Sequence, residues 1–200
     1  MNRIIKEFIH LLFSVTLAIV IFMGLKEYVV QPFQVEGHSM DLTLASGNQM
    51  VLNKVIKEQR FDIITFPDPT GLTTNHYVKR LIGLPGDTIE VKNDQLILNG
   101  IALEEPYLEP LKSQTDGVFT EDFSLWDTIG SITIPEGYYF VMGDNRPQSG
   151  DSRQFGLVPI DSIQGIAEWT YFPIKAFGSV ERYQLNHDAT QIIKRRKFLK

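Results

Sequence analysis

The chain has 200 residues, of which 43% are hydrophobic and 22% charged, a balance typical of a globular domain and not of a disordered protein. It contains no cysteine, which excludes disulfides, zinc–cysteine sites, iron–sulfur clusters and thiol catalysis. The net charge of -5 is unevenly spread: residues 27–193 hold 11 basic and 23 acidic residues, while residues 194–200 hold five basic and none acidic. So acidic a body repels phosphate backbones, which argues against a nucleic-acid partner, and the basic ends favour anionic lipid head groups.

A long apolar segment lies near the N-terminus, where Phe8 to Leu25 contains no Asp, Glu, Lys or Arg over eighteen residues. As a helix with a rise of about 1.5 Å per residue it is roughly 27 Å long, close to the thickness of one bilayer core. A buried core helix would carry a polar face, and a cleaved signal peptide would end in a small-x-small site, which GLKEYVVQPFQ lacks. We therefore predict an uncleaved membrane anchor over residues 8–27.

The charges that flank the anchor predict its orientation. Arg3 and Lys6 precede it and Lys26 follows it, so the positive-inside rule favours a cytoplasmic N-terminus over residues 1–7, although Lys26 reduces the contrast. The rest of the chain would then lie outside the cytoplasm. We expect a single-pass protein of the cell membrane, and a monomer.

Beyond Pro32 the pattern changes to short β-like runs separated by turn signals, with few amphipathic helices. The runs are FQVEG, QMVLNKV, FDIITF, YVKRLIG, TIEVK, QLILNG and SITIPEGYYFVMGD. Asn-Asp at 93–94 and Asn-Gly at 99–100 end two of these runs and predict hairpin turns.

These runs predict a mainly β fold, an antiparallel sheet or barrel-like domain over residues 28–193, tethered by one N-terminal transmembrane helix. Within it, residues 104–130 are acidic and irregular, and we expect an insertion or a long loop. Residues 194–200 form a basic C-terminal tail.

Without cysteine, the candidate nucleophiles are serine, threonine and carboxylates. Ser39 lies in VEGHSMDLTL, directly after the first extended run beyond the anchor. It does not match the nucleophile elbow of the α/β-hydrolases, because no second glycine follows it. A serine after a glycine is most often an ordinary loop residue, so a catalytic role needs a base. A Ser-His-Asp triad with His76 stays open, although no local motif supports it.

Lys79 in HYVKRLIG is a second candidate base. The strand period of two places Tyr77, Lys79 and Leu81 on one face and Arg80 on the other. Apolar neighbours would desolvate the amine and lower its pKa, so that a neutral amine accepts a proton near pH 7. The alternative is a lysine at a sheet edge that extends its amine into water. Arg80 suggests an ion pair.

The segment GDNRPQSGDSR (143–153) follows the predicted strand YYFVM and crowds charged and hydroxyl side chains into one loop. A calcium loop is excluded, because the required glycine and glutamate are missing and two arginines would oppose the cation. Asp151 and Arg153 are two residues apart and predict a charge-assisted pair, which leaves the serine hydroxyls to orient another group. The alternative is a rigid loop with no part in catalysis.

These segments, in this order behind a membrane helix, resemble the bacterial type I signal peptidases, or leader peptidases. Members of that family are membrane-anchored Ser-Lys endopeptidases that remove signal peptides from exported proteins. The resemblance covers the anchor and most of the body, and rests on GHSMDLTL (37–44), RFDIITF (60–66), YVKRLIGLPGD (77–87) and GDNRPQSGDSR (143–153). It implies preprotein signal peptides as substrates, cut after an Ala-x-Ala pattern, with no metal and no cofactor.

The resemblance also implies roles for single residues. Ser39 matches the nucleophile, Lys79 the general base, and Ser149 the hydroxyl that hydrogen-bonds and orients the lysine amine. The residues that support the site in the family correspond in this chain to Arg80, Asp144, Arg146, Asp151 and Arg153. Met40 matches the apolar residue beside the nucleophile at the substrate cleft, and the substrate would add as a strand near Val35, Tyr77 and Leu81.

Two positions depart from the family pattern. Leu42 stands where the family usually has proline, and the loss of that φ restraint predicts a looser loop near the nucleophile. Gly37 stands where some members have a serine that serves the oxyanion hole, which leaves the backbone N–H of Ser39 as one donor.

Two other functions remain to be separated from this one. A Ser-Lys self-cleaving repressor shares the catalytic logic but carries a DNA-binding domain where this chain has a lipid span. A membrane-anchored assembly factor or chaperone, derived from a signal peptidase, would bind secreted subunits without cleaving them. Because the chain keeps both Ser39 and Lys79, we expect an active enzyme.

Overall fold

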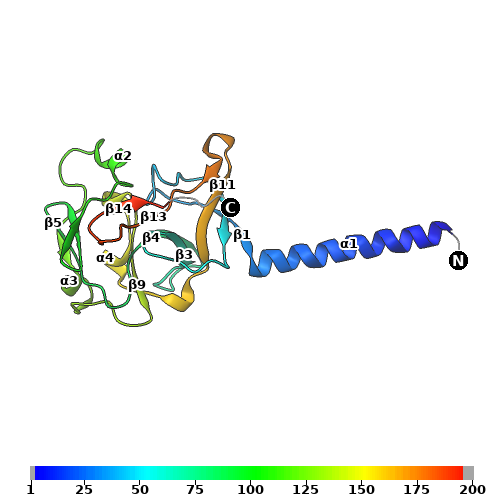
Figure 1. The fold of residues 1–200 in the computed structure, drawn as a ribbon, viewed down its shortest axis with the longest axis horizontal. Coiled ribbons are helices and arrows are strands. Elements are labelled where there is room, and N and C mark those ends of the chain that lie inside the picture. Colours follow the sequence, from blue (N-terminus) through cyan, green and yellow to red (C-terminus); the bar gives the residue numbers. More distant parts are fainter. Residues whose placement is uncertain (1–2, 196–200) are drawn as a thin grey trace.

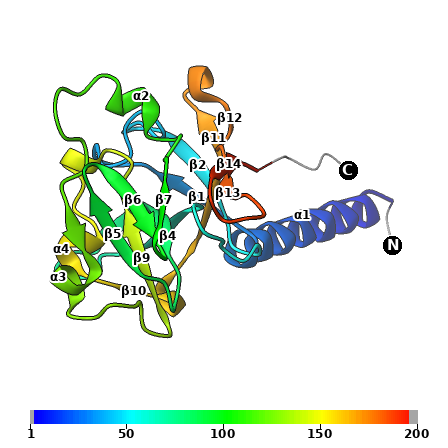
Figure 2. The ribbon, with the colours of Figure 1, turned by 60° about the vertical axis from the view of Figure 1, so that its left-hand side comes forward.

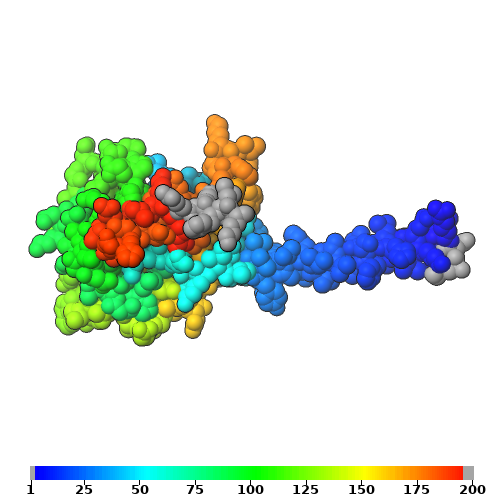
Figure 3. All heavy atoms as spheres, viewed as in Figure 1, coloured from blue at the N-terminus to red at the C-terminus, as the bar shows by residue number. Residues whose placement is uncertain are grey.

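The computed structural model describes residues 3–195, as one long helix attached to a β-rich body (Figure 1). The helix, α1 (Arg3–Tyr28), has 26 residues, none of them buried. In the space-filling view it stands out from the body as a separate rod (Figure 3). Within residues 3–195 it is the one helix long and apolar enough to cross a membrane. An apolar rod without protein neighbours fits a membrane-anchored protein.

The largest sheet of the body has eight strands in antiparallel pairing. Its order is β1-β2-β11-β3-β4-β9-β10, with β12 added beside β11. The strands are β1 (Val30–Gln34), β2 (Gln49–Asn53), β3 (Ile63–Pro67), β4 (His76–Gly83), β9 (Tyr138–Met142), β10 (Val158–Pro159), β11 (Gly165–Phe172) and β12 (Gly178–Ser179). The order places β4 between β3 and β9: Lys79 pairs with Ile64 of β3, and β9 pairs with β4 from Arg80 onward.

A second sheet of four strands, β7-β6-β5-β8, lies on the side of the body away from α1 (Figure 2). Its strands are β5 (Ile89–Lys92), β6 (Gln95–Leu98), β7 (Ile101–Leu103) and β8 (Phe123–Ser124). Both predicted hairpin turns are confirmed. They join β5 to β6 and β6 to β7 through two-residue loops whose four residues all have positive φ, between 52° and 78°, as type I′ turns require.

Residues 104–130 contain α2 (Glu109–Lys112), β8 and α3 (Leu125–Ile129). The segment is part of the packed body, because Tyr107, Leu108 and Phe119 are buried in the core beneath the second sheet. Asp127 closes a capping box with Ser124 at the start of α3.

The remaining elements complete the body. They are α4 (Ser152–Phe155), the two-stranded sheet of β13 (Tyr183–Leu185) and β14 (Ile192–Lys194), and the 3-10 helices η1 (Arg146–Gln148), η2 (Ile160–Ser162) and η3 (Ile174–Ala176). Of the tail, Lys194 and Arg195 lie against the body, and residues 196–200 fall outside the described residues. The prediction of a mainly antiparallel β protein with one N-terminal apolar helix is confirmed.

The two faces of β4 enter different parts of the core, as the strand period predicts. Tyr77 and Leu81 pack with residues of β3 and β9, whereas Val78 packs with Val35 and Met40 on the opposite face. Lys79 and Arg80, each on one of these faces, are both buried.

Candidate active site

Two of the predicted residues meet at the main sheet. Lys79 lies in β4, and Ser39 lies in the turn-rich segment that follows β1, here called the Ser39 loop (residues 37–44). The Nζ of Lys79 donates a hydrogen bond of 2.6 Å to the Oγ of Ser39. His76 is exposed at the start of β4 and forms no hydrogen bond to this serine. The geometry thus pairs the serine with the lysine and not with the histidine.

The amine of Lys79 is kept from water. Only 5% of the residue is exposed, and the ring of Tyr77 lies 5.4 Å from Nζ. Burial lowers the pKa of Lys79 to about 8, even though the charges of Asp151 and Asp144 act to raise it. The direction agrees with the prediction, because removal of water penalises the ammonium form.

Asp144 joins β4 to the Ser39 loop. Its carboxylate accepts two hydrogen bonds from the guanidinium of Arg80, at 2.8 and 2.5 Å, and a third from Thr43 Oγ1 at 2.6 Å. Arg80 is fully buried, and its guanidinium also lies 4.0 Å from the ring centre of Tyr107. Arg80 therefore forms an ion pair, as the sequence suggested, and the pair fixes the loop that carries the serine.

Asn145, the residue after Asp144, bonds the Ser39 loop directly. The backbone N–H of Asn145 donates to the carbonyl oxygen of Ser39 at 3.0 Å, and its side-chain amide donates to the carbonyl oxygen of His38 at 2.9 Å. Residues 143–153, here called the Asp144 loop, therefore fix the backbone on both sides of the serine. Sequence reasoning named neither Asn145 nor Thr43 for this task.

The predicted pair of Asp151 and Arg153 is present. The Nε and Nη2 of Arg153 each donate to the buried carboxylate at 2.8 Å, and the N–H of Gly143 adds a bond of 2.9 Å. Burial raises the pKa of Asp151, but the hydrogen bonds and charge of Arg153 and the Gly143 N–H outweigh it and hold the pKa below its usual value. The carboxylate therefore stays ionised and braces the loop.

Arg146 supports the loop through residues that the sequence did not indicate. It is buried and donates to both carboxylate oxygens of Glu105, at 3.0 and 2.5 Å, while the Tyr107 hydroxyl donates to the same carboxylate at 2.6 Å. Both partners belong to the segment 104–130. The acidic composition of that segment was the available signal, and it did not single out Glu105.

Ser149 lies close to the Ser39 loop, and the hydrogen bond to the lysine amine that the resemblance implies is not among the contacts that this structure shows. Its buried Oγ helps to lower the pKa of the Asp151 carboxyl, and the amine of Lys79 bonds Ser39. Space is tight here: a Cβ on Gly143 would lie 2.2 Å from Ser149 Oγ and 2.4 Å from the carbonyl oxygen of Ser39. Glycine at 143 is what allows the two loops to approach.

The side chains predicted to bind substrate lie mostly in the core. Met40 and Val35 are 1% exposed and Leu81 is fully buried, while Tyr77 is half-buried. Met40 accepts a hydrogen bond at its sulfur from the N–H of Asp144. Val35 and Met40 pack on one face of β4 and Leu81 on the other, so an incoming chain would meet the backbone of these segments and not the buried side chains.

Leu42 lies in a turn of the Ser39 loop, with a backbone conformation that proline cannot adopt. The Thr43 N–H bonds the Met40 carbonyl at 3.1 Å, which makes Leu42 the third residue of a turn, and its φ is +66°. That conformation belongs to a type II turn and is closed to proline, whose ring holds φ near −65°.

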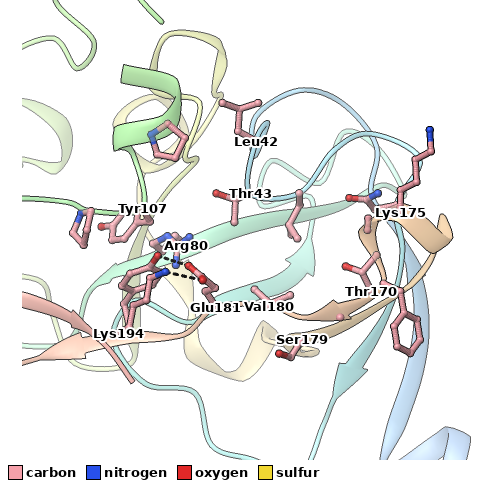
Figure 4. A pocket seen from close by; sticks show the side chains of 18 residues that line it. Leu42, Thr43, Arg80, Tyr107, Thr170, Lys175, Ser179, Val180, Glu181 and Lys194 are labelled. Carbon is pink, nitrogen blue, oxygen red and sulfur yellow. Dashed lines mark hydrogen bonds and ion pairs between the residues drawn. The ribbon is translucent and has the colours of Figure 1, made fainter. Parts of the chain in front are cut away.

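A cavity of about 440 Å³ lies next to residues 42–44 (Figure 4). Arg80 and Tyr107 lie at one end of it and Lys175 at the other, and Glu181 is ion-paired with Lys194 on its floor (Figure 4). Neither Ser39 nor Lys79 lines it. Residues 3–195 contain no cluster of three or more His, Asp or Glu side chains suited to a metal ion.

Comparison with known proteins identifies the family. The family model described as signal peptidase, peptidase S26, matches residues 5–172. Signal peptidase I of Bacillus caldolyticus is 44% identical over 165 residues, covering 80% of this chain and 89% of that protein. Signal peptidase IB of Staphylococcus aureus (strain MRSA252) is 35% identical over 195 residues, covering 93% and 98%.

Among solved structures, a signal peptidase I from Enterococcus faecalis V583 aligns with a TM-score of 0.53 at 47% identity, covering 56% of this chain and 97% of that one. Sequence and fold therefore agree with the resemblance that the four motifs indicated. The chain belongs to the signal peptidase family of serine endopeptidases, peptidase S26.

Proposed function

We propose that this chain is a membrane-anchored endopeptidase that removes N-terminal signal peptides from exported preproteins, with Ser39 as nucleophile and Lys79 as general base. The 2.6 Å contact between Lys79 Nζ and Ser39 Oγ carries the proposal. The pKa of about 8 supports it, because a substantial fraction of the amine is then neutral near physiological pH.

The reaction needs only groups of the chain and one water. Neutral Lys79 takes the proton of Ser39, and the oxygen attacks the carbonyl carbon of the scissile peptide. The resulting ammonium gives its proton to the departing amine as the C–N bond breaks, which leaves an ester on Ser39. Lys79, neutral again, then deprotonates a water that hydrolyses the ester and restores the serine. The N–H of Ser39, which has no acceptor among the described residues, is suited to donate to the oxyanion.

The substrate would bind as an added strand along β4. Leu81 exchanges backbone bonds with residues 61 and 62 on the β3 side, so by strand alternation Val78 directs its N–H and C=O to the opposite edge. On that edge β9 pairs with β4 only from Arg80 onward. The backbone beside Lys79 is therefore open to a peptide that reaches Ser39.

Packing beneath this edge favours small substrate side chains. Val35, Met40 and Val78 share one buried cluster, which forms a packed floor under an added strand. Alternate side chains of the substrate point toward that closed floor, where only small groups fit. This supports the Ala-x-Ala preference that the family resemblance implies.

The anchor would bring enzyme and substrate together. With α1 in the bilayer and its N-terminus in the cytoplasm, β1 begins two residues beyond the helix, so the body lies at the outer membrane surface. The hydrophobic segment of a signal peptide would share that bilayer, which raises the local concentration of the scissile bond.

The test is cleavage of a model preprotein by the full-length chain in detergent. We expect Ser39→Ala and Lys79→Ala each to reduce kcat/KM by about 10³-fold or more. The matched controls Ser113→Ala and Lys92→Ala, at exposed positions outside the site, should retain activity. Unchanged cleavage by the two site variants would overturn the assignment. Binding of the preprotein without cleavage by any form of the chain would favour the assembly-factor function.

A further inference from the structure

An open groove of about 750 Å³ lies beside the Ser39 loop, on the other side of Leu42 from the 440 Å³ cavity, which that residue also lines. One wall comes from the Ser39 loop and the residues after it, with Asp41, Leu42 and Ala45. The facing wall comes from the region of α2 and from η1, with Leu111 and Gln148. We call this space the exit groove.

The exit groove begins at the nucleophile. His38 and Asn145 both line it, and these two residues flank Ser39: Asn145 bonds the carbonyl oxygens of both Ser39 and His38. When the scissile bond of a substrate lies at Ser39, the groove therefore begins about one residue away from that bond.

The topology decides which part of the substrate the groove receives. A strand added beside Val78 cannot continue along β4, because β9 occupies that edge from Arg80 onward. It has to leave the sheet where the Asp144 loop crosses to Ser39, and the groove opens there. Val35, the residue directly after β1, shares a buried cluster with Val78, so the added strand has the segment that follows β1 beside it.

The position of the membrane helix gives the direction. In both ribbon views α2 lies toward the end of the body away from α1 (Figures 1 and 2). A signal peptide held in the bilayer approaches from the α1 side, so the chain beyond the scissile bond runs toward α2.

We infer that the exit groove binds the first residues of the mature chain, on the carboxyl side of the scissile bond, and contributes to substrate selection. This inference rests on the proposed function. Leu42 and Leu111 give the groove apolar surface. Asp41, which bonds His38 at 2.9 Å, is the one carboxylate among its lining residues, so basic or uncharged mature residues are favoured over acidic ones.

The experiment compares two peptide substrates with the same signal-side sequence. One ends directly after the first mature residue, and the other continues for about six more residues, roughly 20 Å of extended chain. Because binding energy from remote contacts contributes to kcat/KM, we expect wild type to cleave the longer peptide about tenfold more efficiently.

Substitutions then fill the groove from either wall. Ala45→Trp and Gln148→Trp change exposed residues on opposite walls, and each should bring the ratio of kcat/KM between long and short peptides close to one. Gln191→Trp, an exposed position far along the chain that does not line the groove, should keep the wild-type ratio. Unchanged thermal unfolding of the variants verifies that they fold.

A charge test adds an independent readout. Long peptides that carry Lys or Asp at the second mature residue should differ severalfold in kcat/KM, in favour of Lys, and Asp41→Asn should remove most of that difference.

A wild-type ratio near one, or tryptophan variants that keep the wild-type ratio, would overturn the inference while Ser39-dependent cleavage of the short peptide upholds the proposed function. Cleavage of the short peptide by Ser39→Ala would instead overturn the proposed function itself.

Discussion

The two faces of β4 bury two cationic side chains in opposite ways. Arg80 receives a carboxylate in direct contact: burial lowers the pKa of Arg80, and the charge and hydrogen bonds of Asp144 raise it by more, so the guanidinium stays charged. Lys79 has no carboxylate in contact and bonds only a hydroxyl, and its pKa falls. In β4, Arg80 thus carries a permanent charge that holds the structure, while the neighbouring Lys79 has an amine that loses its proton more easily.

The strongest way to break this contrast is to remove the carboxylate partner of Arg80. Asp144→Asn keeps the shape of the side chain but leaves the fully buried guanidinium without its counter-charge. We expect the free energy of unfolding to fall by about 3–5 kcal/mol, measured by urea denaturation. Glu181→Gln breaks an exposed ion pair with Lys194 and should cost less than about 1 kcal/mol. Equal losses in the two variants would contradict the contrast.

A second prediction concerns what the buried amine costs the fold. Since the pKa of Lys79 falls from 10.5 to about 8, the unfolded chain binds the proton more tightly. The penalty is complete below pH 8 and disappears as the pH rises toward 10.5, so this group makes stability rise with pH across that window by about 3 kcal/mol. Lys79→Met should lose that rise, which chemical denaturation at several pH values would measure. A parallel pH dependence in both proteins would count against a desolvated amine.

The same amine sets the pH dependence of cleavage. If Lys79 must be neutral, kcat/KM should fall about tenfold for each pH unit below a value near 8. Steady-state rates on a peptide substrate measure this acid limb. An acid limb with an apparent pKa near 10.5, the ordinary lysine value, would show that the amine of Lys79 is not desolvated.

The smallest expected effect sharpens the Arg80 side of the comparison. Thr43→Val removes the 2.6 Å hydrogen bond to Asp144 without much change in shape, and leaves the ion pair in place. We expect a loss of about 1–2 kcal/mol in the free energy of unfolding, since the acceptor is ionised. Thr128→Val, which removes a bond from α3 to the backbone carbonyl of Ser124, is the matched control and should cost less.

Local patterns made part of this structure predictable. The length and apolarity of α1, the two hairpin turns and the alternating faces of β4 depend on residues that are neighbours in sequence. The pair of Asp151 and Arg153 has the same origin, because two residues two apart can close on each other whatever the rest of the fold does. The prediction that Ser39 and Lys79 act as a pair came from the family motifs and not from their spacing in the sequence.

Contacts between distant segments were not predictable in the same way. Glu105 and Tyr107 meet Arg146 and Arg80 only because the segment 104–130 folds against the Asp144 loop. Met40 and Ser149 were given site roles from the family motifs, and both side chains are buried in the structure. Burial depends on what the whole chain places above a residue, which no local motif contains.

The bonds from Asn145 to the Ser39 loop also order events in time. Asn145 and His38 are 107 positions apart in the sequence, so most of the chain must leave the ribosome before the hydrogen bond between them can form. A nascent chain that ends after the helix α1 and the first strands lacks Asn145, so its Ser39 loop is not yet held by these hydrogen bonds. The active site is therefore completed late in synthesis.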